Sequence, residues 1–290
     1  MKRTLTLLAT LFLLTACGRL DTIPYNPPQT PSSWLVMQPY ATLHLGAQTI
    51  IFVQPSTSTI VYFLGVLTIA IGLYFLRIRA GQQSRLWWGI ALLLWGLGAL
   101  LAGTSYEAFS YAIKCAGRAS CLWTSGWEIG YLLVTIWSVD AMLLAVAYSS
   151  TIGKLRKGLS VYATANAALY FLLVMIGVFI PVKFLISFEF LLVFGFPGIF
   201  AFFLINGGRY RQFKQPLDLA LLITWVWLGI TIIAYFAYYL SGNAAALWAK
   251  GIWFTENDVL HIGLILWMLF IAFIVAPKTK DLVETASAEN

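Results

Sequence analysis

Acidic residues and a histidine stand at the ends of three long apolar segments of this chain. Glu107 lies at the end of one segment, Glu128 begins the next, and His261 begins the last. Carboxylates and imidazoles are common general acids and bases, and they also bind zinc, which needs three protein ligands in a catalytic site. If these three ends face one side of a membrane, their side chains form a candidate catalytic or metal site.

The polar residues at these ends also have structural interpretations. Thr255 and Asp258 have the spacing of a helix capping box, which satisfies the first amides of a helix. Glu107 can pair with Lys114 or Arg118 in the loop that follows it. A lone histidine on an apolar helix is more often a packed residue than a ligand. Both interpretations remain open on the sequence.

Two further carboxylates lie inside apolar segments, where charge is expensive. Asp140 lies about 18 Å into its segment at 1.5 Å per residue, just past the middle of a bilayer. Glu189 is expected about a third of the way into its segment. A charge at the bilayer centre costs roughly 2.5–3.5 kcal/mol on insertion scales, so such residues are candidates for function. A hydrogen-bonded structural carboxylate is the alternative for Asp140.

The elements that must position these residues are membrane-spanning helices. Of the 290 residues, 60% are hydrophobic and 10% are charged, whereas soluble proteins average roughly 25% charged. Seven apolar runs are each near the roughly 20 residues that a spanning helix needs. They fall at 59–76, 86–103, 129–148, 160–180, 184–206, 219–240 and 259–276. The sequence therefore predicts an all-α polytopic membrane protein, a bundle of seven transmembrane helices.

Three of the runs carry further signals. The third is polar on two faces, with Glu128 on one and Asp140 on the other, which predicts a central position in the bundle. In the second, Gly89, Gly96 and Gly103 recur every seven residues, as in a close-packed helix seam. In the fifth, residues 194–198 read FGFPG, which marks either a packing irregularity or a cavity near Glu189.

Basic residues predict the orientation of the bundle. With residue 18 outside, the cytoplasmic connections hold eleven basic residues, Arg77, Arg79, Arg85, Lys154, Arg156, Lys157, Arg209, Arg211, Lys214, Lys278 and Lys280. The outer segments hold five, Arg19, Lys114, Arg118, Lys183 and Lys250. This bias follows the positive-inside rule and places the C-terminus in the cytoplasm. It also argues against nucleic-acid binding, because the net charge of +7 is spread over short loops.

The N-terminus resembles a bacterial lipoprotein signal peptide. A basic start and a short apolar run end in Leu14-Thr15-Ala16-Cys17, which is similar to a lipobox. The resemblance implies cleavage after residue 16 and acylation of Cys17. The expected organisation is a signal peptide (1–16), a Pro-rich extracytoplasmic arm (17–58), the transmembrane domain (59–276) and a cytoplasmic tail (277–290). Residues 34–54 are expected at the membrane surface, with His44 outside any site.

Cys115 and Cys121 lie in the outer loop at 104–127. In an oxidising compartment such a pair closes a small disulfide ring that clamps the loop. Free thiols, or metal binding with unidentified partners, are the alternatives.

Polar groups occur at the end of the second apolar run and at the starts of the third and the seventh. This arrangement resembles that of the alkaline ceramidase and progestin/adiponectin receptor superfamily. Its members have seven helices and bind zinc with three histidines, aided by a serine and an aspartate; ceramidases cleave a lipid amide. Ser105 matches the family serine, and His261 matches the first histidine of the seventh helix.

The departures from that pattern fall on the zinc ligands. Phe109 stands where the family has histidine, Ile265 follows His261 by four residues, and Glu128 replaces the aspartate. The chain has two histidines, which excludes a three-histidine site. A mixed zinc site of His261, Glu107 and Glu128 is chemically allowed.

The resulting functional prediction is a bacterial inner-membrane protein with its polar site facing the periplasm. We expect a non-enzymatic ligand-binding, sensor-like or accessory bundle without a cofactor. Its expected partners are membrane lipids and a membrane or periplasmic protein. The alternative is a membrane-embedded lipid hydrolase of ceramidase type, with or without zinc. Transport past Asp140 and Glu189 is a third option, although no inverted repeat is detectable.

Overall fold

The computed structural model describes residues 19–46 and 48–283, so the proposed signal peptide and Cys17 lie outside the described residues. Its described part contains seven helices long and apolar enough to cross a membrane, which confirms the predicted seven-span bundle. They are α3 (Pro55–Arg77), α4 (Gln83–Ala102), α6 (Gly126–Ser150), α7 (Gly153–Phe179), α8 (Phe188–Phe213), α9 (Pro216–Ser241) and α11 (Glu256–Phe270). A π-helical turn, Gly103–Ala108, extends α4, and the turns Ile271–Val275 and Ala276–Lys278 extend α11.

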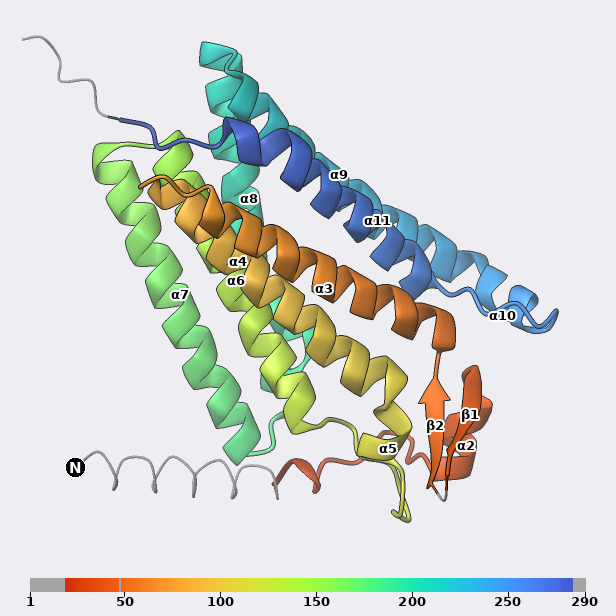
Figure 1. The fold of residues 1–290 in the computed structure, drawn as a ribbon. Helices are drawn as coiled ribbons and strands as arrows, with labels where there is room; N and C mark the ends of the chain where they lie inside the picture. Colours follow the sequence, from red (N-terminus) through yellow and green to blue (C-terminus); the bar gives the residue numbers. More distant parts are fainter. Residues whose placement is uncertain (1–18, 47, 284–290) are drawn as a thin grey trace, which may run out of the picture.

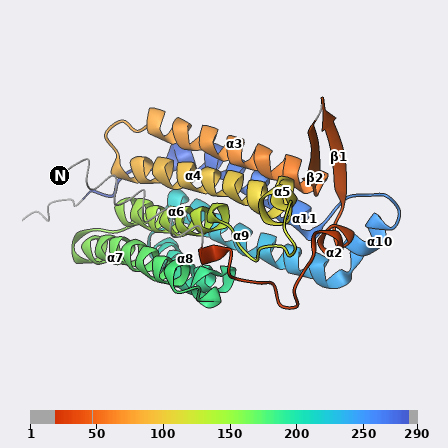
Figure 2. The same cartoon turned by 90° about the horizontal axis from the view of Figure 1, so that it is seen from below.

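Helix α6 occupies the centre of the bundle, as its two polar faces predicted. Figure 2 shows α3, α4, α6 and α7 side by side in that order, with α8, α9 and α11 completing the bundle. Inside the protein, 67% of the α6 span is buried, against 28–39% for the other six spans. Most of the α6 surface therefore contacts protein, whereas the other helices each present a broad face to lipid.

The glycine seam lies between α3 and α4. A Cβ atom at Gly96 would lie 2.7 Å from the Gly65 carbonyl oxygen, and one at Gly72 would lie 3.0 Å from the Gly89 carbonyl oxygen. Small residues allow helix backbones to approach in this way, and close van der Waals packing drives helix association in lipid. The seven-residue spacing in α4 is thus confirmed as a packing feature.

The two ends of the bundle differ (Figure 1). One end, the hairpin end, carries α2 (Pro31–Val36), the antiparallel strands β1 (Tyr40–Leu45) and β2 (Gln48–Val53), α5 (Ser110–Lys114) and α10 (Asn243–Trp248). A 3₁₀ turn at Lys183–Ile186 joins α7 to α8 at this end. Residues 34–54, predicted only as a surface segment, thus contain the second half of α2 and both strands. His44 is exposed on β1, next to the Thr49 hydroxyl at 3.2 Å.

At the opposite end, the tail end, the C-terminal segment runs across the bundle. Asp281 accepts hydrogen bonds from the amides of Gln83 and Ser84, each at 2.7 Å, and so caps the first turn of α4. Arg85 donates to the Thr279 carbonyl oxygen at 2.8 Å. The two Asp281 contacts satisfy helix-terminal amides that have no partner within α4 itself.

A variant of the glycine seam tests the packing of α3 against α4. Gly96→Leu forces a side chain into the Gly65 backbone, and we expect the free energy of unfolding in detergent to fall by about 1–3 kcal/mol or more, as overpacking does. Gly229→Leu on α9 is the matched control, because a Cβ atom there meets nothing within 4 Å. Equal unfolding midpoints for the two variants would contradict the seam.

Candidate functional site

A buried ion pair occupies Glu128, the first acidic candidate. The Lys114 ammonium group lies 2.7 Å from its Oε1 atom, and the two side chains are 5% and 2% exposed. The same ammonium group lies over the Tyr106 ring, 5.2 Å from its centroid. Because the carboxylate of Glu128 is already neutralised by a cation, it is poorly suited to act as a base or a metal ligand.

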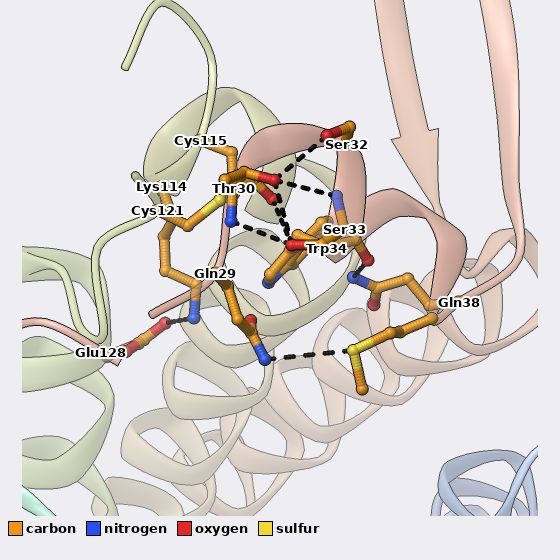
Figure 3. The surroundings of a disulfide bond; sticks show 11 residues. Gln29, Thr30, Ser32, Ser33, Trp34, Gln38, Lys114, Cys115, Cys121 and Glu128 are labelled. Carbon is orange, nitrogen blue, oxygen red and sulfur yellow. Dashed lines mark hydrogen bonds and ion pairs between the residues drawn. A yellow bond between two sulfur atoms is a disulfide. The ribbon is translucent and has the colours of Figure 1, made fainter. Parts of the chain in front are cut away.

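A disulfide lies next to this ion pair. Cys115 and Cys121 form the predicted bond, directly after Lys114 (Figure 3). They pack with Trp34 and Val53 in a small core. Backbone hydrogen bonds from Cys121 to Gln29 and from Leu122 to Lys114 join the loop to the N-terminal arm and to α5. The predicted clamp therefore connects the arm, α5 and the start of α6.

Glu107 pairs with neither Lys114 nor Arg118, so the pairing suggested by the sequence is wrong. Lys114 contacts Glu128 instead, and Arg118 contacts Asp21 at 3.3 Å on the surface. Glu107 lies in the π-helical turn, 4% exposed, and its Oε2 atom has no hydrogen-bond partner among the described residues. The Asp258 carboxyl group lies close enough to interact electrostatically with the Glu107 carboxyl group.

Asp258 caps α11, which confirms the predicted capping box with Thr255. The hydroxyl of Ser56 donates to Asp258 Oδ2 at 3.2 Å, and the hydroxyls of Thr57 and Thr255 lie 3.0 Å apart. These contacts join the starts of α3 and α11 at the hairpin end. One carboxylate oxygen of Asp258, Oδ1, remains buried without a partner among the described residues.

His261 faces a cavity of about 460 Å³ inside the bundle. Its Nδ1 atom is buried and makes no hydrogen bond within the described part of the chain. The wall is otherwise mostly aliphatic and aromatic, and Tyr131 and Thr135 of α6 add two hydroxyls. The lining residues come from six helices, α3, α4, α6, α8, α9 and α11, and nearly all lie in the half of the bundle nearer the hairpin end.

The cavity exists because α8 and α9 diverge (Figure 1). At the tail end, Arg209 of α8 contacts Asp218 of α9 at 3.0 Å. Toward the hairpin end, α8 packs on α7, with the rings of Phe190 and Tyr170 stacked 5.6 Å apart, while α9 follows α11. The cavity therefore widens between α8 and α9 away from their shared turn.

The cavity reaches the surface of the bundle on this side. Phe188, Leu192 and Phe196 of α8, together with Ile232 of α9, line it and are also exposed on the outside of the bundle. These rim residues are apolar and lie within spanning helices, so the opening faces the hydrocarbon of the bilayer rather than water.

The remaining predicted residues lie elsewhere. Asp140 is buried against α7, where the Asn166 amide donates to both its carboxylate oxygens at 3.0 and 3.2 Å. Ser105 donates to the Leu101 carbonyl oxygen of its own helix at 2.9 Å. Glu189 lies at the very start of the fifth span rather than a third of the way into it, because the preceding residues form a 3₁₀ turn and α8 begins at Phe188; it is exposed in the first turn of that helix.

The structure thus brings Glu107, Glu128 and His261 to one end of the bundle but gives each different neighbours. Within the described residues, no group of three or more His, Cys, Asp or Glu side chains is arranged to hold a metal ion. The FGFPG segment does border the cavity, through Gly195 and Phe196, although Glu189 does not.

Loss of the buried cation tests how much the ion pair stabilises the hairpin end. Lys114→Met leaves the Glu128 carboxylate buried and unpaired, and we expect it to cost about 3–5 kcal/mol of unfolding free energy. Replacing both partners with apolar residues, as in K114M/E128L, should recover most of that loss. Arg118→Met, at an exposed pair, should change stability by less than about 1 kcal/mol. Equal losses of unfolding free energy in Lys114→Met and Arg118→Met would contradict a stabilising role for the buried pair.

Comparison with known proteins adds no family to this picture. No protein-family model matches the chain, and no curated protein shows significant similarity to it.

Proposed function

We propose that this integral membrane protein binds a small, membrane-resident apolar molecule in the cavity between α8 and α9, and that it acts by binding rather than by catalysis. The supporting observation is the cavity itself, with its apolar wall and its opening toward lipid. Its volume of about 460 Å³ falls in the range of roughly 300–1,000 Å³ typical of small-molecule sites. Membrane lipids are the molecules that such an opening admits.

The contacts of the acidic residues favour binding over hydrolysis. A hydrolase needs a base that activates water close to the reacting bond. Glu128 is paired with Lys114, and no charged side chain in the described part of the chain lines the cavity beside His261. An enzyme of ceramidase type remains the alternative, and a lipid amide cleaved by the purified protein would establish it.

We further propose that the hairpin end faces the periplasm of a bacterial inner membrane. The eleven basic residues of the opposite connections and the tail support this orientation, and so does a disulfide in the hairpin-end loop, because disulfides persist in oxidising compartments. In this proposal an acylated Cys17 anchors the arm to the outer leaflet. The arm and the disulfide loop then form the surface that a membrane or periplasmic protein would contact.

Filling the cavity tests the binding proposal. Gly195 lies on its wall, and a Cβ atom there would be 3.6 Å from Ile136, so Gly195→Leu enters the cavity without striking backbone. We expect native mass spectrometry of the purified protein to show a bound lipid in the wild type and its loss in this variant. Gly208→Leu, on the same helix with nothing within 4 Å of its Cβ, should retain the lipid. Equal lipid retention by both variants contradicts the proposed site.

Labelling of single cysteines tests the orientation. Gln212→Cys, at the tail end, should react with a membrane-impermeant maleimide only after the cells are opened. Ala245→Cys, at the hairpin end, should react in intact cells. Both positions are exposed, so each introduced thiol is accessible from its own side of the membrane. The native Cys115 and Cys121 are joined in a disulfide and do not react. Labelling of Gln212→Cys from outside would reverse the proposed topology.

A further inference from the structure

Few polar side chains of the described residues line the cavity, and none of them is acidic or a lysine or arginine. Tyr131 and Thr135 contribute hydroxyls from α6, and His261 contributes an imidazole from α11. Within the described residues, none of the three side chains makes a hydrogen bond. No aspartate, glutamate, lysine or arginine of the described part lines the cavity.

His261 is the most informative of these groups. Several buried side-chain atoms in the described part of the chain lack a hydrogen bond, and His261 Nδ1 is the one whose residue lines the cavity. A buried polar atom without a partner is costly, so native structures rarely leave one unless a water or a ligand supplies the bond. Because the surrounding wall is apolar and opens toward lipid, a lipid group is better placed than water to supply it.

The depth of His261 fixes where a ligand's polar group would lie. It is the sixth residue of α11, which begins at Glu256, about 8 Å from the start of the helix at 1.5 Å per residue. Leu260 and Leu264 line the cavity on either side of it. The exposed rim residues Leu192 and Phe196 lie on α8, across the cavity from α11. A molecule with its head at His261 can therefore extend its chain between α8 and α9 into the membrane.

We propose that the cavity selects an amphiphile with a single hydrocarbon chain and an uncharged hydrogen-bonding head, a hydroxyl or a carbonyl, which bonds to His261. This inference rests on the proposed binding function and adds the chemical class of the ligand. The neutral imidazole has one donor and one acceptor nitrogen, so it can bond either kind of head. Tyr131 and Thr135 provide further hydroxyls in the cavity lining.

A charged head does not fit the same site. An ion buried in an apolar wall loses its hydration and needs a counter-charge, and the described lining offers none. An anionic head would also approach the Glu107 and Asp258 carboxyls, which lie near the start of α11. The cavity therefore discriminates by the absence of charged partners as well as by the presence of His261.

The test uses three photoactivatable probes that differ only in the head group: hexadecanol, hexadecanoic acid and hexadecane, each with a diazirine on the chain. The full-length protein in detergent is labelled over a range of probe concentrations, and mass spectrometry locates the labelled peptides. We expect hexadecanol to label α8, α9 and α6 at the lowest concentration. His261→Leu should raise its half-saturating concentration about fivefold to tenfold, the effect of one lost hydrogen bond, and leave hexadecane unchanged.

Two further variants separate the possible outcomes. His261→Gln, which keeps a donor and an acceptor, should restore part of the hexadecanol affinity, whereas Gly195→Leu should abolish labelling by every probe. If hexadecanol and hexadecane label alike, and both depend on Gly195, the cavity binds lipid but the head-group inference is wrong. Preference for hexadecanoic acid overturns it as well. If no probe labels the cavity, the proposed binding function itself fails.

Discussion

In lipid, a polar group within a spanning helix needs a partner inside the protein, and this constraint organises the bundle around α6. The Ser138 hydroxyl donates to the Ala91 carbonyl oxygen of α4 at 2.8 Å, and Asp140 accepts two hydrogen bonds from α7. Glu128 meets Lys114 at the hairpin end. The other helices therefore pack against a central helix that would be unstable alone in hydrocarbon, and this explains why α6 is buried more than any other span.

The same constraint applies to the polar residues beside the cavity. Asn206 shows the usual solution deep in the bundle: it accepts from the Trp225 indole at 3.0 Å and donates to Ser150 at 3.2 Å. His261 is also buried in the bundle, but its Nδ1 atom has no hydrogen-bond partner among the described residues. It lies beside a cavity that opens toward lipid. A bound amphiphile resolves both features at once, because its chain fills the apolar space and its head completes the hydrogen bonding.

Features that depend on neighbouring residues were predictable from sequence. Apolar run length gave the seven spans, the spacing of Thr255 and Asp258 gave the cap, and one short loop gave the disulfide. Features that depend on how helices are oriented were not. The Lys114–Glu128 pair requires α5 to fold back on α6, Glu189 was misplaced because a 3₁₀ turn precedes α8, and the cavity requires two helices to diverge. Of the features noted in the sequence, the FGFPG segment lies on the cavity wall through Gly195 and Phe196.

The most direct test of this account is an experimental structure of the protein crystallised from a lipidic mesophase. The account predicts continuous density between α8 and α9, shaped as a single chain, with its polar end roughly 2.7–3.2 Å from an imidazole nitrogen of His261. A closed interface between α8 and α9, or a cavity holding only ordered water around His261, would contradict it.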